Sequence, residues 1–134
     1  MKGFLMQRQT VTAGQETFIE SFSPENNYGV VFEDDGETGY FYAVELDPVS
    51  KEQRILDALH IYEAEDSNAQ ESKQLLIIWS KDWLKCALVV GGICNAIFDF
   101  KDQGGYSINE FPPPNDIWTK HPRALTDDII NQLF

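Results

Sequence analysis

The sequence is poor in the residues that build disulfide frameworks and metal centres. Its 134 residues include only two cysteines and two histidines. Cys86 and Cys94 form no CxxC pair, and no HExxH motif is present. The glycine pairs at 91–92 and 104–105 lack the flanking pattern of a phosphate-binding loop. We therefore expect no metal ion, no nucleotide and no other cofactor.

Long apolar runs and clusters of basic residues are also missing. No segment approaches the ~20 apolar residues that span a bilayer, and residues 1–10 lack the uninterrupted apolar core of a signal peptide. The ten lysines and arginines form no run, whereas a protein that binds phosphates needs clustered basic side chains. The sequence therefore predicts a cytoplasmic protein that binds neither a membrane nor nucleic acid.

Acidic residues, in contrast, are abundant and unevenly placed. Asp and Glu number 22 against 10 Lys and Arg, which gives a net charge of −12. Residues 1–67 hold 14 acids and 4 bases, whereas residues 68–134 hold 8 acids and 6 bases. Such a charge keeps a protein soluble, which is its simpler role, and it also suits a basic protein partner.

Short alternating or β-branched runs between turn residues dominate the chain, a pattern typical of antiparallel sheet. Residues 17–22 predict a first strand, and residues 28–46 predict a hairpin around a polar turn. Thr126, followed by two acids, predicts a helix start, because the hydroxyl can cap the first turn. We expect one α+β domain over residues 1–134, a mainly antiparallel β-meander sheet of about six or seven strands with a C-terminal α-helix.

Residues 51–63 are ambiguous between a strand and a helix. Residues 50–53 resemble a capping box. The residues that would share a helical face are Ile55, Leu56, Leu59 and Tyr62. The residues that would share a strand face are Leu56, Ala58, His60 and Tyr62. We favour the strand.

The apolar residues on both sides of the turn near residues 91–92 indicate the register of this hairpin. A three-residue loop, 91–93, pairs position 88 with 96 and 86 with 98 and gathers the apolar side chains on one face. Cys86 and Cys94 then lie about 13 Å apart at ~3.3 Å per residue, beyond disulfide reach. Both should be free thiols. The three prolines at 112–114 exclude an interior strand, so that segment should wrap an edge or end of the sheet.

The best candidate for a binding surface is the hairpin 28–46, which combines acids with aromatic residues. Tyrosine and tryptophan are enriched at recognition surfaces. The candidate binding residues are Asp34, Asp35, Glu37, Tyr40, Tyr42 and His60. A simpler interpretation also exists, in which the aromatic rings pack a core and the acids only solubilise the chain.

No catalytic constellation is evident. Asp57 precedes His60 by three positions, a spacing that pairs side chains on a helix but separates them on a strand. No nucleophile is placed against either residue. We therefore expect a non-catalytic protein. The enzymatic alternative is a small-molecule pocket near His60 that uses Asp57 or Asp99.

Four segments in a fixed order carry a resemblance to a known family: ILDALHIY (55–62), WSKDWLKCALVV (79–90), AIFDF (96–100) and FPPPNDIW (111–118). Over residues 28–118 the sequence resembles a family of small uncharacterised bacterial proteins. The resemblance implies a bacterial source and no established activity. Trp83 departs from the pattern, because similar strand-turn-strand motifs often carry glycine after such a turn.

The function that these observations favour is that of a small, acidic, non-catalytic bacterial protein that binds a basic protein partner, in the manner of immunity proteins or small inhibitors. Two alternatives stay open. One is the small-molecule-binding or enzymatic domain with a pocket near His60. The other is a self-associating structural domain, a homodimer whose exposed edge strands pair across a two-fold axis.

Overall fold

The computed structural model describes residues 1–66 and 71–134, which form nine β-strands and one α-helix. The strands are β1 (Phe4–Thr12), β2 (Thr17–Phe22), β3 (Tyr28–Asp34), β4 (Thr38–Leu46), β5 (Gln53–Glu63), β6 (Ser72–Trp79), β7 (Lys85–Val90), β8 (Ile93–Asp99) and β9 (Gly104–Ser107). The helix is α1 (Asp127–Leu133). The strands form a four-stranded sheet, in the order β2-β3-β4-β5, and a five-stranded sheet, in the order β1-β6-β7-β8-β9.

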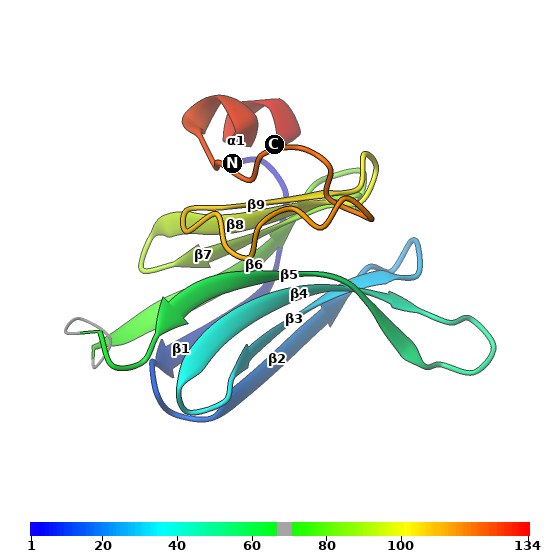
Figure 1. Ribbon diagram of the computed structural model, residues 1–134. Helices are drawn as coiled ribbons and strands as arrows, with labels where there is room; N and C mark the ends of the chain where they lie inside the picture. The colour runs from blue at the N-terminus through cyan, green and yellow to red at the C-terminus, as the bar shows by residue number, and fades with distance from the viewer. Residues whose placement is uncertain (67–70) are drawn as a thin grey trace.

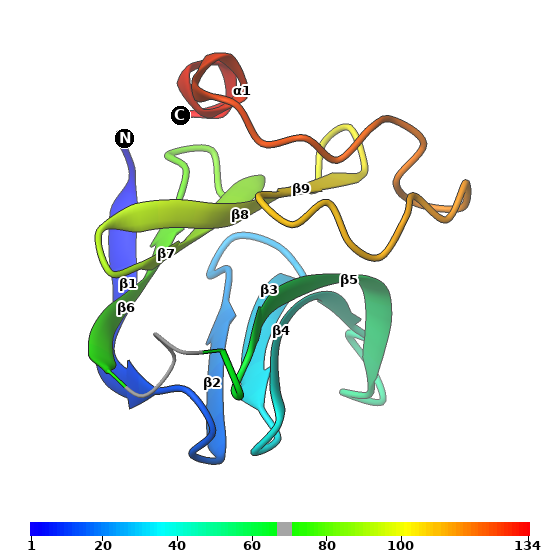
Figure 2. The ribbon, with the colours of Figure 1, turned by 60° about the vertical axis from the view of Figure 1, so that its left-hand side comes forward.

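The two sheets pack face to face, and α1 lies on the far side of the five-stranded sheet (Figures 1 and 2). Alternation along each strand sends every second side chain into the space between the sheets. The fully buried residues there include Phe32, Phe41 and Leu59 from one sheet and Ile77, Leu88 and Phe98 from the other. This shared apolar layer is the core.

Antiparallel strands and a C-terminal helix are confirmed, but one continuous meander is not. Sequential neighbours pair within β2–β5 and within β6–β9, whereas β1 pairs with β6. β1 was not predicted, because it lies at a sheet edge and most of its residues are exposed on both faces. β9 was not predicted either, because it contains Gly104 and Gly105. A Cβ at Gly104 would lie 1.9 Å from His121 Nε2, so only glycine fits beneath that ring.

Residues 53–63 are a strand and not a helix, as we favoured. His60 of β5 lies opposite Tyr40 of β4, and the register of this strand pair shifts between Gly39 and Tyr40 and again between Ala43 and Val44. The shift beside Tyr40 turns Tyr62 away from the face that His60 occupies. Its hydroxyl donates to Asp34 at 2.6 Å, and its ring lies 6.0 Å from that of Phe32. The expected grouping of Tyr62 with His60 was therefore wrong.

The β7–β8 hairpin keeps the predicted pairing at its base but not the predicted loop. Cys86 pairs with Phe98 and Leu88 with Ala96. Nearer the turn the register shifts, and Val90 pairs with Ile93 across a two-residue loop of glycines with φ of 60° and 82°. Cys94 then pairs with Val89, so the two cysteines lie on opposite faces, and both are free thiols.

The chain end follows the sequence prediction. Thr126 Oγ1 accepts a hydrogen bond from the Ile129 amide, which caps α1. The proline segment forms no strand, and the Phe111 carbonyl instead accepts from the His60 amide at 2.9 Å. This bond places the segment along the outer edge of β5.

Candidate binding surface

Tyr40 and Tyr42 point outward from the four-stranded sheet. Each neighbours the fully buried Phe41 on β4, and strand alternation therefore directs both rings away from the core. The two rings stack with centroids 5.9 Å apart. The His60 ring meets the Tyr40 ring edge-on at 5.4 Å. Three of the six predicted residues thus come together on one face.

Two exposed phenylalanines extend this face in both directions. Phe18 lies opposite Glu33, and Glu33 lies opposite Tyr40, so these side chains form one cross-strand row. Beyond His60, the Phe111 ring lies 6.1 Å away. Phe18 is 60% exposed and Phe111 is 52% exposed. We call this set the aromatic face: Phe18, Glu33, Tyr40, Tyr42, His60 and Phe111.

Hydrogen bonds on both ring nitrogens hold His60 in place. The Asn109 side-chain amide donates to His60 Nδ1 at 2.9 Å and to the carbonyls of His60 and Ile61. Because Nδ1 accepts, these partners assign the proton to Nε2, which donates to Glu63 Oε1 at 2.9 Å. The side chain is 15% exposed. His60 is therefore held in a fixed position between Tyr40 and Phe111 on the aromatic face.

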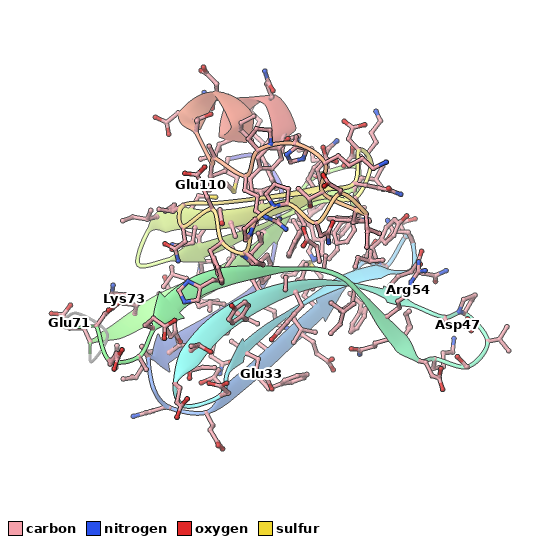
Figure 3. All side chains as sticks on the ribbon, in the orientation of Figure 1. Glu33, Asp47, Arg54, Glu71, Lys73 and Glu110 are labelled. Atoms are coloured by element: carbon pink, nitrogen blue, oxygen red, sulfur yellow. The ribbon has the colours of Figure 1, made fainter. Side chains whose placement is uncertain are left out.

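The aromatic face carries a negative field. Figure 3 shows Glu33 on the outer side of the four-stranded sheet, and Glu16, Phe18, Glu33 and Asp35 line one shallow depression beside it. Partial burial raises the pKa of Tyr42, and the charges of Glu33 and Asp35 raise it further. The amides of Thr38 and Glu37 donate to Asp35 and lower its pKa. The fully exposed Asp35 carboxylate is therefore ionised at neutral pH.

Asp34 lies inside the protein, apart from the other predicted acids. It is 1% exposed. Its carboxylate accepts from the Gly14 amide at 2.8 Å, the Gly36 amide at 2.8 Å and the Tyr62 hydroxyl at 2.6 Å. Burial and this bond to Asp34 raise the pKa of Tyr62. Asp34 thus ties two turns to β5, while Asp35 and Glu37 stay exposed at the tip of the β3–β4 hairpin.

Asp57 and Asp99, the two carboxylates of the enzymatic alternative, stabilise the fold. Asp57 forms a buried ion pair with Arg123 at 2.8 Å. Asp99 accepts from the amides of Lys101 and Asp102 at the β8–β9 turn, and burial raises its pKa. Within residues 1–66 and 71–134, no three His, Cys, Asp or Glu side chains are grouped as a metal ion would require. No helix in that part of the chain has the length and apolarity to cross a membrane.

Sequence reasoning missed three members of the aromatic face. Phe18 alternates with the buried Ile19, and that alternation is a signal that could have identified an exposed phenylalanine. Placing Glu33 on this face required the register of β2, β3 and β4. Phe111 had no signal, because a long-range contact places it beside His60.

Comparison with known proteins agrees with the resemblance in the sequence. Residues 11–134 match the model of the family DUF2251, described as uncharacterized protein conserved in bacteria. An uncharacterized protein of Haemophilus influenzae (strain Rd) is 41% identical over 97 residues, which is 70% of this chain and 59% of that protein. The chain thus spans less than two-thirds of the length of this relative. No solved structure matches the chain. Because the family match covers all but the first ten residues, this protein belongs to the bacterial DUF2251 family.

Proposed function

We propose that this protein is a non-catalytic binding module whose aromatic face engages a basic protein partner, as immunity proteins and small inhibitors do. The observation that carries the proposal is the row of Phe18, Glu33, Tyr40, His60 and Phe111, which crosses the whole four-stranded sheet. Its two ends, Phe18 and Phe111, are exposed, and the tyrosine and histidine rings between them are partly exposed. So continuous an aromatic row is uncommon on a surface that contacts only water.

The chemistry of the row suits arginine-rich surfaces. A guanidinium group can stack on the ring of Tyr40 or Tyr42 and pair with the carboxylate of Glu33 between them and Phe18. Tyrosine rings supply large contact areas at small cost in side-chain entropy, and bonds from Asn109 and to Glu63 already fix His60. The aromatic face contains no lysine or arginine, so a basic partner meets no like charge there.

The net charge of −12 supports the same choice of partner. A negative field attracts a basic protein over about 8–10 Å at physiological ionic strength, which speeds association and makes it sensitive to salt. We therefore expect a faster association at low salt and a slower one when Glu33 is neutralised.

The experiment is capture from a lysate of the source bacterium, followed by titration of the purified captured partner against point variants. Tyr40→Ala should weaken binding by about tenfold or more, as for a central aromatic anchor. Glu33→Gln should weaken binding and reduce its salt dependence. Glu52→Gln removes the same charge from the exposed β4–β5 loop and should leave the affinity unchanged. A partner that is not basic, or equal affinity for wild type and Tyr40→Ala, would overturn the proposal.

Self-association is a second candidate, because β1 forms an edge of the five-stranded sheet. Phe4, Leu5 and Met6 on this strand are exposed apolar residues. A register shift between Leu5 and Gln7 interrupts the edge, which works against pairing with another strand. Sedimentation velocity at two concentrations tests this candidate, and a monomer at both would remove it.

A further inference from the structure

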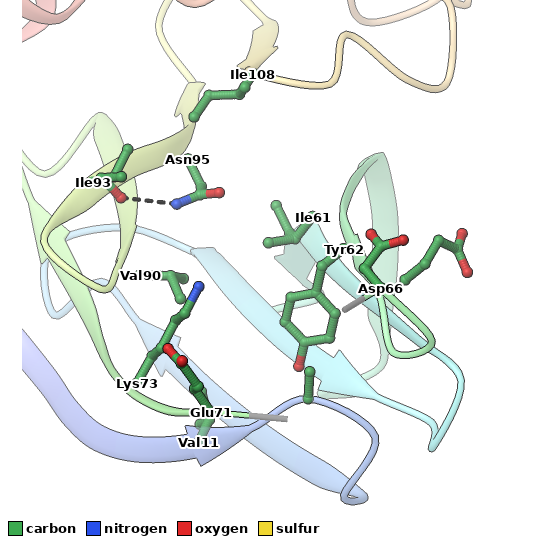
Figure 4. Close-up of a pocket in the computed structure, with 12 residues that line it drawn as sticks. Val11, Ile61, Tyr62, Asp66, Glu71, Lys73, Val90, Ile93, Asn95 and Ile108 are labelled. Carbon is green, nitrogen blue, oxygen red and sulfur yellow. Dashed lines mark hydrogen bonds between the residues drawn. The ribbon is translucent and has the colours of Figure 1, made fainter. Parts of the chain in front are cut away.

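A cleft of about 340 Å³ opens at one end of the sandwich, where the two sheets separate. β5 forms one wall, and β1, β6, β7 and β8 contribute to the other. Figure 4 shows Ile61 and Tyr62 facing Val90 and Lys73 across this space. The volume falls at the small end of the ~300–1,000 Å³ range of small-molecule sites.

The base of the cleft is apolar. Val11, Ile61 and Val90 come from three different strands, and the first two are almost fully buried members of the core. Ile93 and Ile108 line the cleft nearer to solvent. A hydrocarbon group that entered between these residues would lose contact with water without displacing a polar group.

Tyr62 forms a rigid aromatic part of the wall. Its hydroxyl is held by Asp34 at 2.6 Å. Its ring lies directly on Gly39, since a Cβ at that glycine would lie 2.7 Å from Tyr62 Cζ. Because both contacts fix the ring, it offers a preformed aromatic surface to whatever occupies the cleft.

Acidic side chains outnumber basic ones around the opening. Among the residues that the structure describes, the cleft is lined by three acids, Glu63, Asp66 and Glu71, and by one base, Lys73. Figure 3 shows Glu71 and Lys73 at the same end of the sandwich. Three carboxylates against one ammonium group leave a net negative site, which favours a cation over an anion.

We propose that this cleft binds a small apolar amine, a primary ammonium group carried on a short alkyl or aryl substituent. The substituent packs on Val11, Ile61 and Val90. The ammonium group lies among the carboxylates, near the ring of Tyr62, where both ion pairing and cation–π attraction favour it. No member of the aromatic face lines the cleft in the described part of the chain, and the link between them is Glu63, which lines the cleft and accepts a hydrogen bond from His60.

The test is a titration of the full chain with three probes that each contain a phenyl ring. Changes in the backbone amide signals in NMR report the binding of each probe. The probes are 2-phenylethylamine, 2-phenylethanol and 3-phenylpropanoate. We expect saturable shifts for the amine, concentrated at Ile61, Tyr62, Lys73 and Val90, with weaker binding of the alcohol and weakest binding of the carboxylate. The proposal fails if the carboxylate binds as well as the amine, or if no probe saturates.

Charge variants distinguish binding of the amine in the cleft from its general attraction to an acidic protein. The double variant Asp66→Asn with Glu71→Gln changes two exposed side chains and should weaken amine binding by about tenfold. The matched control, Glu25→Gln with Glu52→Gln, makes the same change in net charge on exposed residues away from the cleft and should have no effect. Equal weakening by both variants would overturn the proposal. None of these four residues belongs to the aromatic face, so the result is independent of partner binding.

Discussion

The carboxylate of Asp57 accepts hydrogen bonds from both terminal nitrogens of Arg123, each at 2.8 Å, across 66 positions of sequence. The two side chains are 3% and 1% exposed, respectively. Thr119 Oγ1 donates to the same carboxylate at 2.5 Å, and Arg123 Nε donates to the Pro112 carbonyl at 2.6 Å. The ion pair therefore fastens the segment after β9 to β5, and with it the position of Phe111 beside His60.

Breaking this pair should destabilise the fold strongly. Arg123→Ala leaves the Asp57 carboxylate buried without its counter-charge, which we expect to lower the free energy of unfolding by about 3–5 kcal/mol. Urea denaturation measures the loss. The double variant Asp57→Leu with Arg123→Met should recover much of it, because no unpaired charge then remains. A double variant as unstable as Arg123→Ala would show that packing, rather than the unpaired charge, dominates.

Trp83 combines a strained backbone with aromatic packing. It has φ of 60° and stacks on Phe4 with centroids 4.9 Å apart. Trp83→Ala and Trp83→Gly both remove the ring, but only glycine adopts this φ without strain. We expect the alanine variant to be less stable than the glycine variant by about 1 kcal/mol. Thermal unfolding compares the two, and equal stabilities would contradict the assigned turn conformation.

Both thiols should be unreactive in the native protein. Burial raises the pKa of Cys86 well above its ordinary value and that of Cys94 to about 11. The thiolate is the reacting form, so alkylation by iodoacetamide near neutral pH should be slow in buffer and fast in urea. Mass spectrometry should find Cys94 modified before Cys86, which is completely buried. Rapid modification of Cys86 in the folded protein would contradict the arrangement of the core.

Asp82 should make the fold sensitive to acid. Although partial burial acts in the opposite direction, hydrogen bonds from Lys85 and Ser80 lower its pKa from 3.8 to about 2. The folded state therefore gains stability from the ionised carboxylate above pH 3.8 and loses it as the pH falls to about 2. Half of this side chain is in solvent, so the effect is modest. Asp82→Asn should flatten the acid limb of the unfolding curve, which urea titrations at several pH values measure.

Short-range patterns in the sequence were enough to predict the strands with clear apolar alternation and the helix with a clear N-cap. The hairpin 28–46, the strand 53–63 and the helix after Thr126 all depend on spacings within a few residues. The same period of two places Tyr40 and Tyr42 together on one face of their strand, but it does not decide whether that face is the outer one. Such features need no knowledge of which distant segment packs against them.

The remaining features depend on distant partners. Asp34 and Asp35 look alike in the sequence, but Asp34 turns inward because the Gly14 amide and the Tyr62 hydroxyl donate to it. The predicted three-residue loop between β7 and β8 was wrong because the register shifts beyond Leu88. With that shift, Leu88 still pairs with Ala96 although the loop has only two residues. No local pattern could show that Arg123 would pair with Asp57.

The pairing of β1 with β6 has a consequence for the order of folding. The four strands of one sheet lie between these two strands in the sequence, and each of them pairs with its neighbour along the chain. During synthesis, β2 to β5 can pair with one another before residues 72–79, which form the partner strand of β1, have been made. Because closing so long a loop is slow, we expect the five-stranded sheet to assemble late, against an existing four-stranded sheet that serves as its template.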